Sequence, residues 1–152
     1  MIELVKPTLG DIPKMQELVK SEVENGVILF RDEDDMANTI RSYMLAKDDG
    51  ELVGFAALHI YSPKLAEIRS LVIKDSYRGK GLGKALLGAL ESEGKKLGVS
   101  QILTLTYQKE FFEKSGFIEI PKENIPEHKI WADCIKCKHF PICNEISLIK
   151  TI

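Results

Sequence analysis

A seven-residue segment near the middle of the chain has the composition of an anion-binding loop. Its residues, in order, are Arg78, Gly79, Lys80, Gly81, Leu82, Gly83 and Lys84. Glycines let the backbone adopt positive φ angles and let a ligand approach the amide groups closely. The apolar spacing that follows predicts a helix beginning at this loop, and amides at a helix N-terminus bind anions with the help of the helix dipole. The segment therefore predicts a phosphate or diphosphate ligand; the alternative is a tight glycine turn with a basic, solvated face.

Two common nucleotide-binding motifs do not fit this loop. A P-loop needs glycine where Arg78 stands and serine or threonine where Ala85 stands. A dinucleotide-binding fingerprint has the pattern Gly-x-Gly-x-x-Gly, and neither Gly79-x-Gly81 nor Gly81-x-Gly83 is followed by the third glycine. The fingerprint also follows the first strand of its fold, whereas this loop follows a later strand. The loop fits a different pattern, Arg-x-x-Gly-x-Gly.

A second cluster of reactive side chains lies near the C-terminus, in the pattern Cys134-x-x-Cys137-x-His139-x-x-x-Cys143. Three thiolates and an imidazole could complete a tetrahedral zinc site. The alternatives are reduced thiols buried as small apolar side chains and a labile disulfide between Cys134 and Cys137. We expect buried thiols and no bound metal, because ligands so close together would need a sharply folded loop.

The apolar periodicity predicts a mixed α/β domain that places the glycine loop between a strand and a helix. Asp48-Asp49-Gly50 predicts a hairpin turn. The predicted order is strand, two helices, three antiparallel strands, then helix, strand, helix and two strands. The strands are 2–6, 43–47, 52–61, 66–73, 101–106, one from 116, and 146–149; the helices are 12–26, one from 32 with an apolar face to residue 44, 82–98 and 110–115.

Length, charge and composition limit the classes of protein to which the chain can belong. Its 152 residues suit a single domain over residues 1–152, with residues 121–152 as a tail. With 21 basic and 23 acidic side chains, it has no overall field to attract nucleic acid or anionic lipid. No apolar run approaches the ~18 residues of a membrane span, the N-terminus lacks a signal-peptide pattern, and three cysteines make no disulfide framework. We therefore expect a cytoplasmic protein without nucleic-acid or membrane partners.

The chain resembles the GNAT superfamily of acetyl-CoA-dependent N-acetyltransferases in its glycine motif and in two further segments, Leu71-Val72-Ile73 and Phe111-Phe112-Glu113-Lys114-Ser115-Gly116-Phe117. The resemblance implies acetyl-CoA as co-substrate and a single domain with a mostly antiparallel sheet flanked by helices. It implies that the amides of residues 79–84 hold the diphosphate of coenzyme A, while Arg78 and Lys80 add mobile positive charge. It also implies a bulge near residues 71–73, which exposes backbone groups to the pantetheine arm and the thioester.

Acetyl transfer to an amine needs a base for the ammonium and a donor for the developing oxyanion. A glutamate on this strand matches the base position of part of the family, so we expect Glu67 to be the base. On a strand, Glu67, Arg69 and Leu71 share a face unless a bulge intervenes. The alternative for Glu67 is a surface ion pair with Arg69. The oxyanion donor would be the backbone N–H of Leu71 or Val72.

The leaving thiolate also takes a proton, and the family commonly supplies it from a tyrosine. Here that place holds Phe112, which we expect at the coenzyme but which cannot donate a proton. Either Tyr107 substitutes, or the thiolate leaves unassisted. The alternative for Tyr107 is an aromatic residue of the core or of the rim.

Two arginines are candidates for binding a substrate carboxylate. Arg31 ends the link between the first two helices and could instead pair with Asp34 or Asp35; Arg69 lies on the same strand as Glu67. Two arginines facing a small pocket would favour an amino acid over a polyamine or a histone tail.

A narrower resemblance covers nearly the whole chain. Residues 26–31, 67–72 and 105–107 and the tail motif Trp131-x-Asp133-Cys134-x-x-Cys137 resemble the short, single-domain bacterial N-acetylglutamate synthases. This resemblance implies acetylation of the α-amine of an amino acid, L-glutamate, at the start of arginine biosynthesis, with a homodimer as a candidate assembly. The alternatives are another small amine or a protein N-terminus as acceptor, and a non-catalytic acyl-CoA or amino-acid sensor, which the missing tyrosine at Phe112 favours.

Overall fold

Short segments rich in apolar side chains form seven strands in residues 1–125 and 145–152, the part of the chain that the computed structural model describes. The strands are β1 (Ile2–Val5), β2 (Tyr43–Asp48), β3 (Glu51–Ile60), β4 (Leu65–Ile73), β5 (Gln101–Thr106), β6 (Ile118–Glu119) and β7 (Ile146–Thr151). They make one sheet in the order β1-β2-β3-β4-β5-β7-β6. The pairing is antiparallel between all neighbours in this sheet except β4 and β5.

The hairpin between β2 and β3 is the one that the sequence predicts at residues 48–50. Asp49 and Gly50 join the two strands with φ angles of 48° and 87°. Two consecutive residues with positive φ give a turn whose twist matches the right-handed twist of the flanking strands. This turn sets the register of β2 and β3 next to it, as far as the register shift between Ala46 and Lys47.

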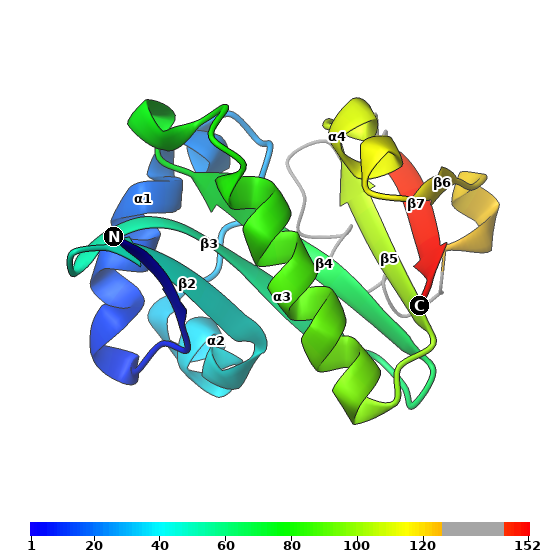
Figure 1. Cartoon of the computed structure of the whole chain (residues 1–152), viewed down its shortest axis with the longest axis horizontal. Coiled ribbons are helices and arrows are strands. Elements are labelled where there is room, and N and C mark those ends of the chain that lie inside the picture. The colour runs from blue at the N-terminus through cyan, green and yellow to red at the C-terminus, as the bar shows by residue number, and fades with distance from the viewer. Residues whose placement is uncertain (126–144) are drawn as a thin grey trace.

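β4 and β5 run parallel and are joined through α3, because parallel neighbours need a crossover connection. Their pairing runs from Leu65 opposite Gln101 to Ile68 opposite Thr104. Both strands continue beyond this last pair, so their carboxyl-terminal ends separate. Figure 1 shows the two strands diverging towards the end of the sheet at which α3 begins.

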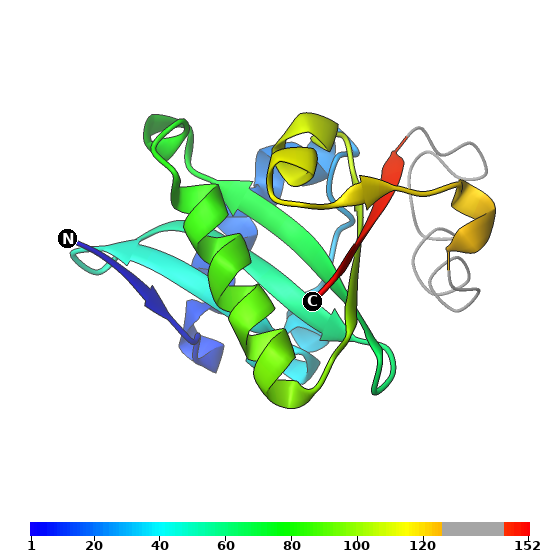
Figure 2. The same cartoon turned by 45° about the vertical axis from the view of Figure 1, so that its right-hand side comes forward.

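Helices cover both faces of the sheet (Figures 1 and 2). They are α1 (Ile12–Glu24), α2 (Glu33–Asn38), α3 (Leu82–Leu97) and α4 (Lys109–Lys114). One apolar cluster joins α1 and α2 to β2 and β3, and two others join α3 to the opposite face. The predicted α/β class and element order are confirmed. No described helix is long and apolar enough to cross a membrane.

A bulge in β4 changes which side chains face each layer. Phe55 of β3 pairs with Val72 of β4, and the next pair is Ala57 with Arg69. One residue of β3 therefore lies opposite two residues of β4, so β4 holds one extra residue. Ser70 lies there with a φ of 55°, in the left-handed region. The bulge thus lies at residues 70–71, slightly before the expected 71–73.

The bulge also corrects the predicted face of Leu71. Glu67 and Arg69 do share a face, but an inserted residue reverses the alternation after it. Leu71 therefore packs with the clusters under α3, and Val72 packs with the cluster under α1 and α2.

Two helix predictions also need correction. The second helix ends at Asn38, and Tyr43, predicted to continue its apolar face, instead begins β2. Leu97, expected on the buried face of α3, is 64% exposed, because the helix extends beyond the sheet-covered part there. Neither change affects the order of the elements.

Candidate functional site

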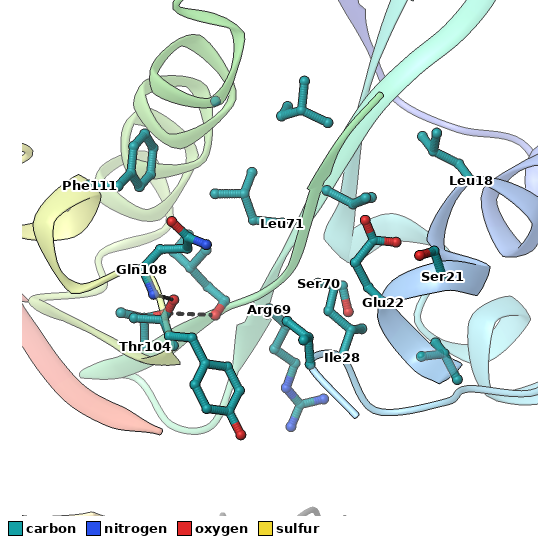
Figure 3. Close-up of a pocket in the computed structure, with 18 of the residues that line it drawn as sticks. Leu18, Ser21, Glu22, Ile28, Arg69, Ser70, Leu71, Thr104, Gln108 and Phe111 are labelled. Atoms are coloured by element: carbon teal, nitrogen blue, oxygen red, sulfur yellow. Dashed lines mark hydrogen bonds between the residues drawn. The ribbon is translucent and has the colours of Figure 1, made fainter. Parts of the chain in front are cut away.

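The opening between β4 and β5 leads into a cleft of about 2070 Å³. Its walls come from α1, the link between α1 and α2, the bulge of β4, the glycine loop, the end of β5 and α4. Pockets for a single small molecule typically measure ~300–1,000 Å³, so this cleft has room for an elongated ligand beside a second one. In Figure 3, Leu71 and Phe111 lie on one side of β4, and Ser70, Glu22 and Ile28 lie on the other.

The glycine loop has the conformation of an anion site. Gly79 and Gly81 have φ angles of 76° and 80°, and Gly81 is the N-cap of α3. The first amides of a helix have no carbonyl partner within it, so those of α3 can bind an anion at the cleft wall. A Cβ at Gly83 would lie 3.4 Å from the ring of Phe111, which therefore packs directly on the loop.

The two cations expected to be mobile have partners in the structure. The Nε of Arg78 donates to the carbonyl of Ile73 at 3.2 Å, and its Nη2 donates to Oε1 of Glu22 at 3.2 Å. The same Nη2 lies 3.2 Å from the carboxylate of Asp75. Lys80 places Nζ 5.5 Å from the centre of the Tyr77 ring. Arg78 thus joins the loop to α1 across the cleft.

Glu22 was not found by sequence reasoning, because its position depends on a contact between segments 56 residues apart. Its Oε1 accepts the bond from Arg78. Its Oε2 is buried with no hydrogen-bond partner in the part of the chain that the structure describes. A buried carboxylate oxygen normally has a donor, so this atom offers an acceptor to a ligand in the cleft.

Glu67, Arg69 and Tyr61 form a closed set of hydrogen bonds at the other end of the cleft. Arg69 Nε donates to Glu67 Oε1 at 2.6 Å, and the Tyr61 hydroxyl donates to the same oxygen at 2.8 Å. Arg69 Nη2 donates to the Tyr61 oxygen at 2.9 Å. The ion pair between Glu67 and Arg69 that the sequence offered as an alternative is present. It is buried rather than on the surface, because Glu67 is only 2% exposed.

Tyr61 is a second residue that sequence reasoning missed. His59 pairs with Glu67 across the β3–β4 turn, so Tyr61, two residues after His59, lies on the same face as Glu67. The pairing register on either side of this turn is the signal from which Tyr61 could have been predicted to lie beside Glu67. Burial, together with the negative charge of Glu67, raises the pKa of the Tyr61 phenol, which therefore stays protonated and acts as a donor.

Arg31 and Arg69 approach the same buried tyrosine. Burial raises the pKa of the Tyr43 phenol, and the nearby positive charges of Arg31 and Arg69 oppose that rise. Ala57 lies opposite both Tyr43 and Arg69 in the sheet. A smaller hollow of about 230 Å³, lined by Arg31, Tyr43 and Ser70 among others, adjoins this region. The two arginines predicted to bind a carboxylate thus belong to one region of the cleft.

The aromatic residues near the end of β5 differ in exposure. Tyr107 is 39% exposed and lines the cleft, which makes it a rim residue. Phe112 is 2% exposed and packs edge to face against Phe111 and Phe117. Phe112 is thus mainly a core residue, and it is Phe111 that contacts the glycine loop.

The cysteine cluster, Cys134, Cys137, His139 and Cys143, lies outside the described residues, so the zinc and disulfide alternatives stay predictions. Within residues 1–125 and 145–152, no three histidine, cysteine or acidic side chains are grouped as a metal site would require.

Known proteins share this architecture. A model of the acetyltransferase (GNAT) family matches residues 12–117. An N-acetyltransferase of Chlorobaculum tepidum, named as uncharacterized, is 34% identical over 95% of this chain and 92% of its own length. The amino-acid acetyltransferase of Pasteurella multocida is 28% identical over 80% of this chain. The N-acetylglutamate synthase of Neisseria gonorrhoeae, complexed with coenzyme A and N-acetyl-glutamate, has the same fold, with a TM-score of 0.89 at 24% identity over 99% of this chain.

The latter two relatives are much longer than this chain. The matched part covers 28% of the Pasteurella protein and 35% of the Neisseria protein. The likeness therefore concerns only a part of each.

The raised pKa of Tyr61 predicts how stability depends on pH. The folded protein holds this proton more tightly than the unfolded chain, whose tyrosines titrate near pH 10. The free energy of unfolding should therefore fall as pH rises above 10, and the fall should be shallower in Tyr61→Phe, by at most about 1.4 kcal/mol per pH unit for one proton. Urea denaturation of both proteins at several pH values between 9 and 11.5 measures this, and identical slopes would contradict it.

Proposed function

The chain belongs to the acetyltransferase (GNAT) family, and from that premise we propose that it transfers the acetyl group of acetyl-CoA to the α-amine of an amino acid, L-glutamate. The observation that carries the acceptor assignment is that Arg31 and Arg69 both line the same cleft as Glu67. Two guanidinium groups suit an acceptor with two carboxylates. The names of the Pasteurella and Neisseria relatives support this acceptor class, and the reaction would begin arginine biosynthesis.

The glycine loop is the proposed binding site for the diphosphate of the coenzyme. The amides of residues 79–84 would hold the diphosphate, because they surround the N-terminus of a 16-residue helix and the glycines adopt the φ angles that the loop needs. Arg78 and Lys80 add positive charge beside it. The pantetheine arm would follow Val72 and Ile73, where β4 has no paired residue on β5.

The reaction would proceed between these two ends of the cleft. Glu67 would take a proton from the acceptor ammonium, directly or through a water molecule. The free amine then attacks the thioester carbonyl, and the N–H of Leu71 or Val72 at the bulge would stabilise the oxyanion. As the C–S bond breaks, the attacking nitrogen gives its remaining extra proton to water. The thiolate leaves unassisted or takes a proton from Tyr107, the rim tyrosine at the cleft, which water then reprotonates.

The acceptor would be fixed mainly by Arg31. Arg69 contributes positive charge and already shares hydrogen bonds with Glu67 and Tyr61. An ammonium bound close to Glu67 and a carboxylate bound by Arg31 would orient the acceptor's α-amine towards the bulge.

Turnover of acetyl-CoA with each amino acid, with polyamines and with peptides tests this function. We expect thioester consumption with L-glutamate and the formation of N-acetyl-L-glutamate. Faster turnover with a polyamine or a peptide would show that the acceptor is another amine rather than L-glutamate. No turnover with any acceptor, together with binding of coenzyme A, would support the non-catalytic sensor.

The loop assignment predicts a loss of coenzyme binding in Gly81→Val. The valine side chain would occupy the diphosphate site, and its backbone would be strained at a φ of 80°. Gly98→Val is a matched control, because Gly98 caps the other end of α3 at a φ of 95° and a Cβ there also meets nothing within 4 Å. Calorimetry should show at least about a tenfold weaker affinity for acetyl-CoA in Gly81→Val only; equal affinities in the two variants would refute the loop assignment.

The base assignment predicts that Glu67→Gln lowers kcat by about 10²-fold or more, the usual effect of losing a general base. The amide keeps the shape of the side chain but cannot accept the ammonium proton. Steady-state rates across pH 5–9 with L-glutamate and acetyl-CoA measure the change, and circular dichroism checks that the variant is folded. A wild-type rate with an unchanged pH profile would leave Glu67 as a structural partner of Arg69.

The acceptor assignment predicts that Arg31→Ala and Arg69→Ala raise the KM for L-glutamate by about tenfold or more, as expected when a charged hydrogen bond is lost. The KM for acetyl-CoA should change little. Arg41→Ala serves as a control, because Arg41 is exposed and does not line the cleft. If neither glutamate KM moves, the carboxylates are bound elsewhere.

A further inference from the structure

Tyr61 is a half-buried phenol that the proposed reaction does not use. It follows β3 in the turn to β4, and its ring is held on two sides. The ring of His59 meets it edge to face with the centres 4.8 Å apart, and the guanidinium carbon of Arg69 lies 5.6 Å from its centre. These contacts fix the position of the hydroxyl group.

The chemistry of the three partners fixes the direction of each hydrogen bond. A guanidinium can only donate, so the Tyr61 oxygen accepts from Arg69 Nη2 at 2.9 Å. The phenol proton is then directed to Glu67 Oε1, 2.8 Å away, which also accepts from Arg69 Nε. Two donors on one oxygen hold the carboxylate in one orientation.

We propose that Tyr61 is a positioning residue for acetyl transfer, which acts by holding the carboxylate of Glu67 in a fixed orientation at the cleft wall. The inference rests on the proposed function, because it takes Glu67 as the proton acceptor. It goes beyond that function because it assigns a role to a residue outside both the coenzyme loop and the acceptor pocket. Tyr61 touches neither reacting atom and acts only through Glu67.

The expected consequence of Tyr61→Phe differs from that of simple structural damage. Phenylalanine keeps the ring and its contact with His59 but removes the donor to Glu67. The carboxylate should then lose its fixed orientation, so kcat should fall by roughly tenfold, the equivalent of one hydrogen bond to a charged group. The KM for acetyl-CoA should stay unchanged, because Tyr61 does not line the glycine loop.

A double-mutant cycle tests whether Tyr61 acts through Glu67. The four proteins are the wild type, Tyr61→Phe, Glu67→Gln and the double variant, assayed with L-glutamate and acetyl-CoA across pH 5–9. We expect Tyr61→Phe to lower kcat at neutral pH in the wild-type background by roughly tenfold. In the Glu67→Gln background it should change kcat by less than about twofold, because the residue through which it acts has lost its function.

A second variant keeps the test decisive if Tyr61→Phe does not fold. Site-specific 3-fluorotyrosine at position 61 retains the shape of the phenol and makes it a stronger donor, so its effect on kcat should appear in the wild-type background and be lost in the Glu67→Gln background. If Glu67→Gln alone shows the wild-type rate, the base assignment fails and this inference fails with it. If Glu67→Gln is slow, equal changes in kcat in both backgrounds for either Tyr61 variant would overturn the role of Tyr61 alone.

Discussion

The short parallel pairing between β4 and β5 is the constraint on which the rest of the structure depends. It holds the two halves of the sheet together from Leu65 and Gln101 to Ile68 and Thr104, and then it ends. Because the pairing is parallel, the chain must cross over through a helix, and α3 begins next to the carboxyl end of β4. The crossover that parallel pairing requires therefore also places the N-terminus of α3 at the edge of the opening between β4 and β5.

The charged side chains around this opening form two pairs, each made of one glutamate and one arginine. Glu22 holds Arg78 at the glycine loop, and Glu67 holds Arg69 at the opposite end. The chain as a whole has a net charge of −2, yet cations stand at both ends of the cleft. A coenzyme with a diphosphate and an acceptor with carboxylates would each meet positive charge, while the region between them would be left for the neutral amine and the thioester. Paired arginines keep a defined position, which free ones on long side chains would not.

Local sequence signals predicted most of the fold, because each depends on residues that are close together in the chain. The hairpin at Asp49 and Gly50, the start of α3 after the glycine loop and the seven strands all follow from turn residues and apolar period. The glycine loop and the two arginines were proposed from their residue types and Glu67 from the family resemblance, and the structure places all of them in the walls of one cleft. The face of Leu71 was not, since it depends on how β4 registers against β3. Glu22 and Tyr61 were missed for the same kind of reason: the first meets a residue 56 positions away, and the second reaches Glu67 across a turn.

The bulge at Ser70 has a consequence for how this strand can change in evolution. Substitutions between Glu67 and Ile73 alter one contact at a time, but loss of a single residue there would restore the regular alternation of the strand. Leu71 and Val72 would then exchange layers, and each apolar cluster would receive a side chain fitted to the other. A substitution along this segment changes one side chain, whereas a change in its length would disturb both of the cores that it serves.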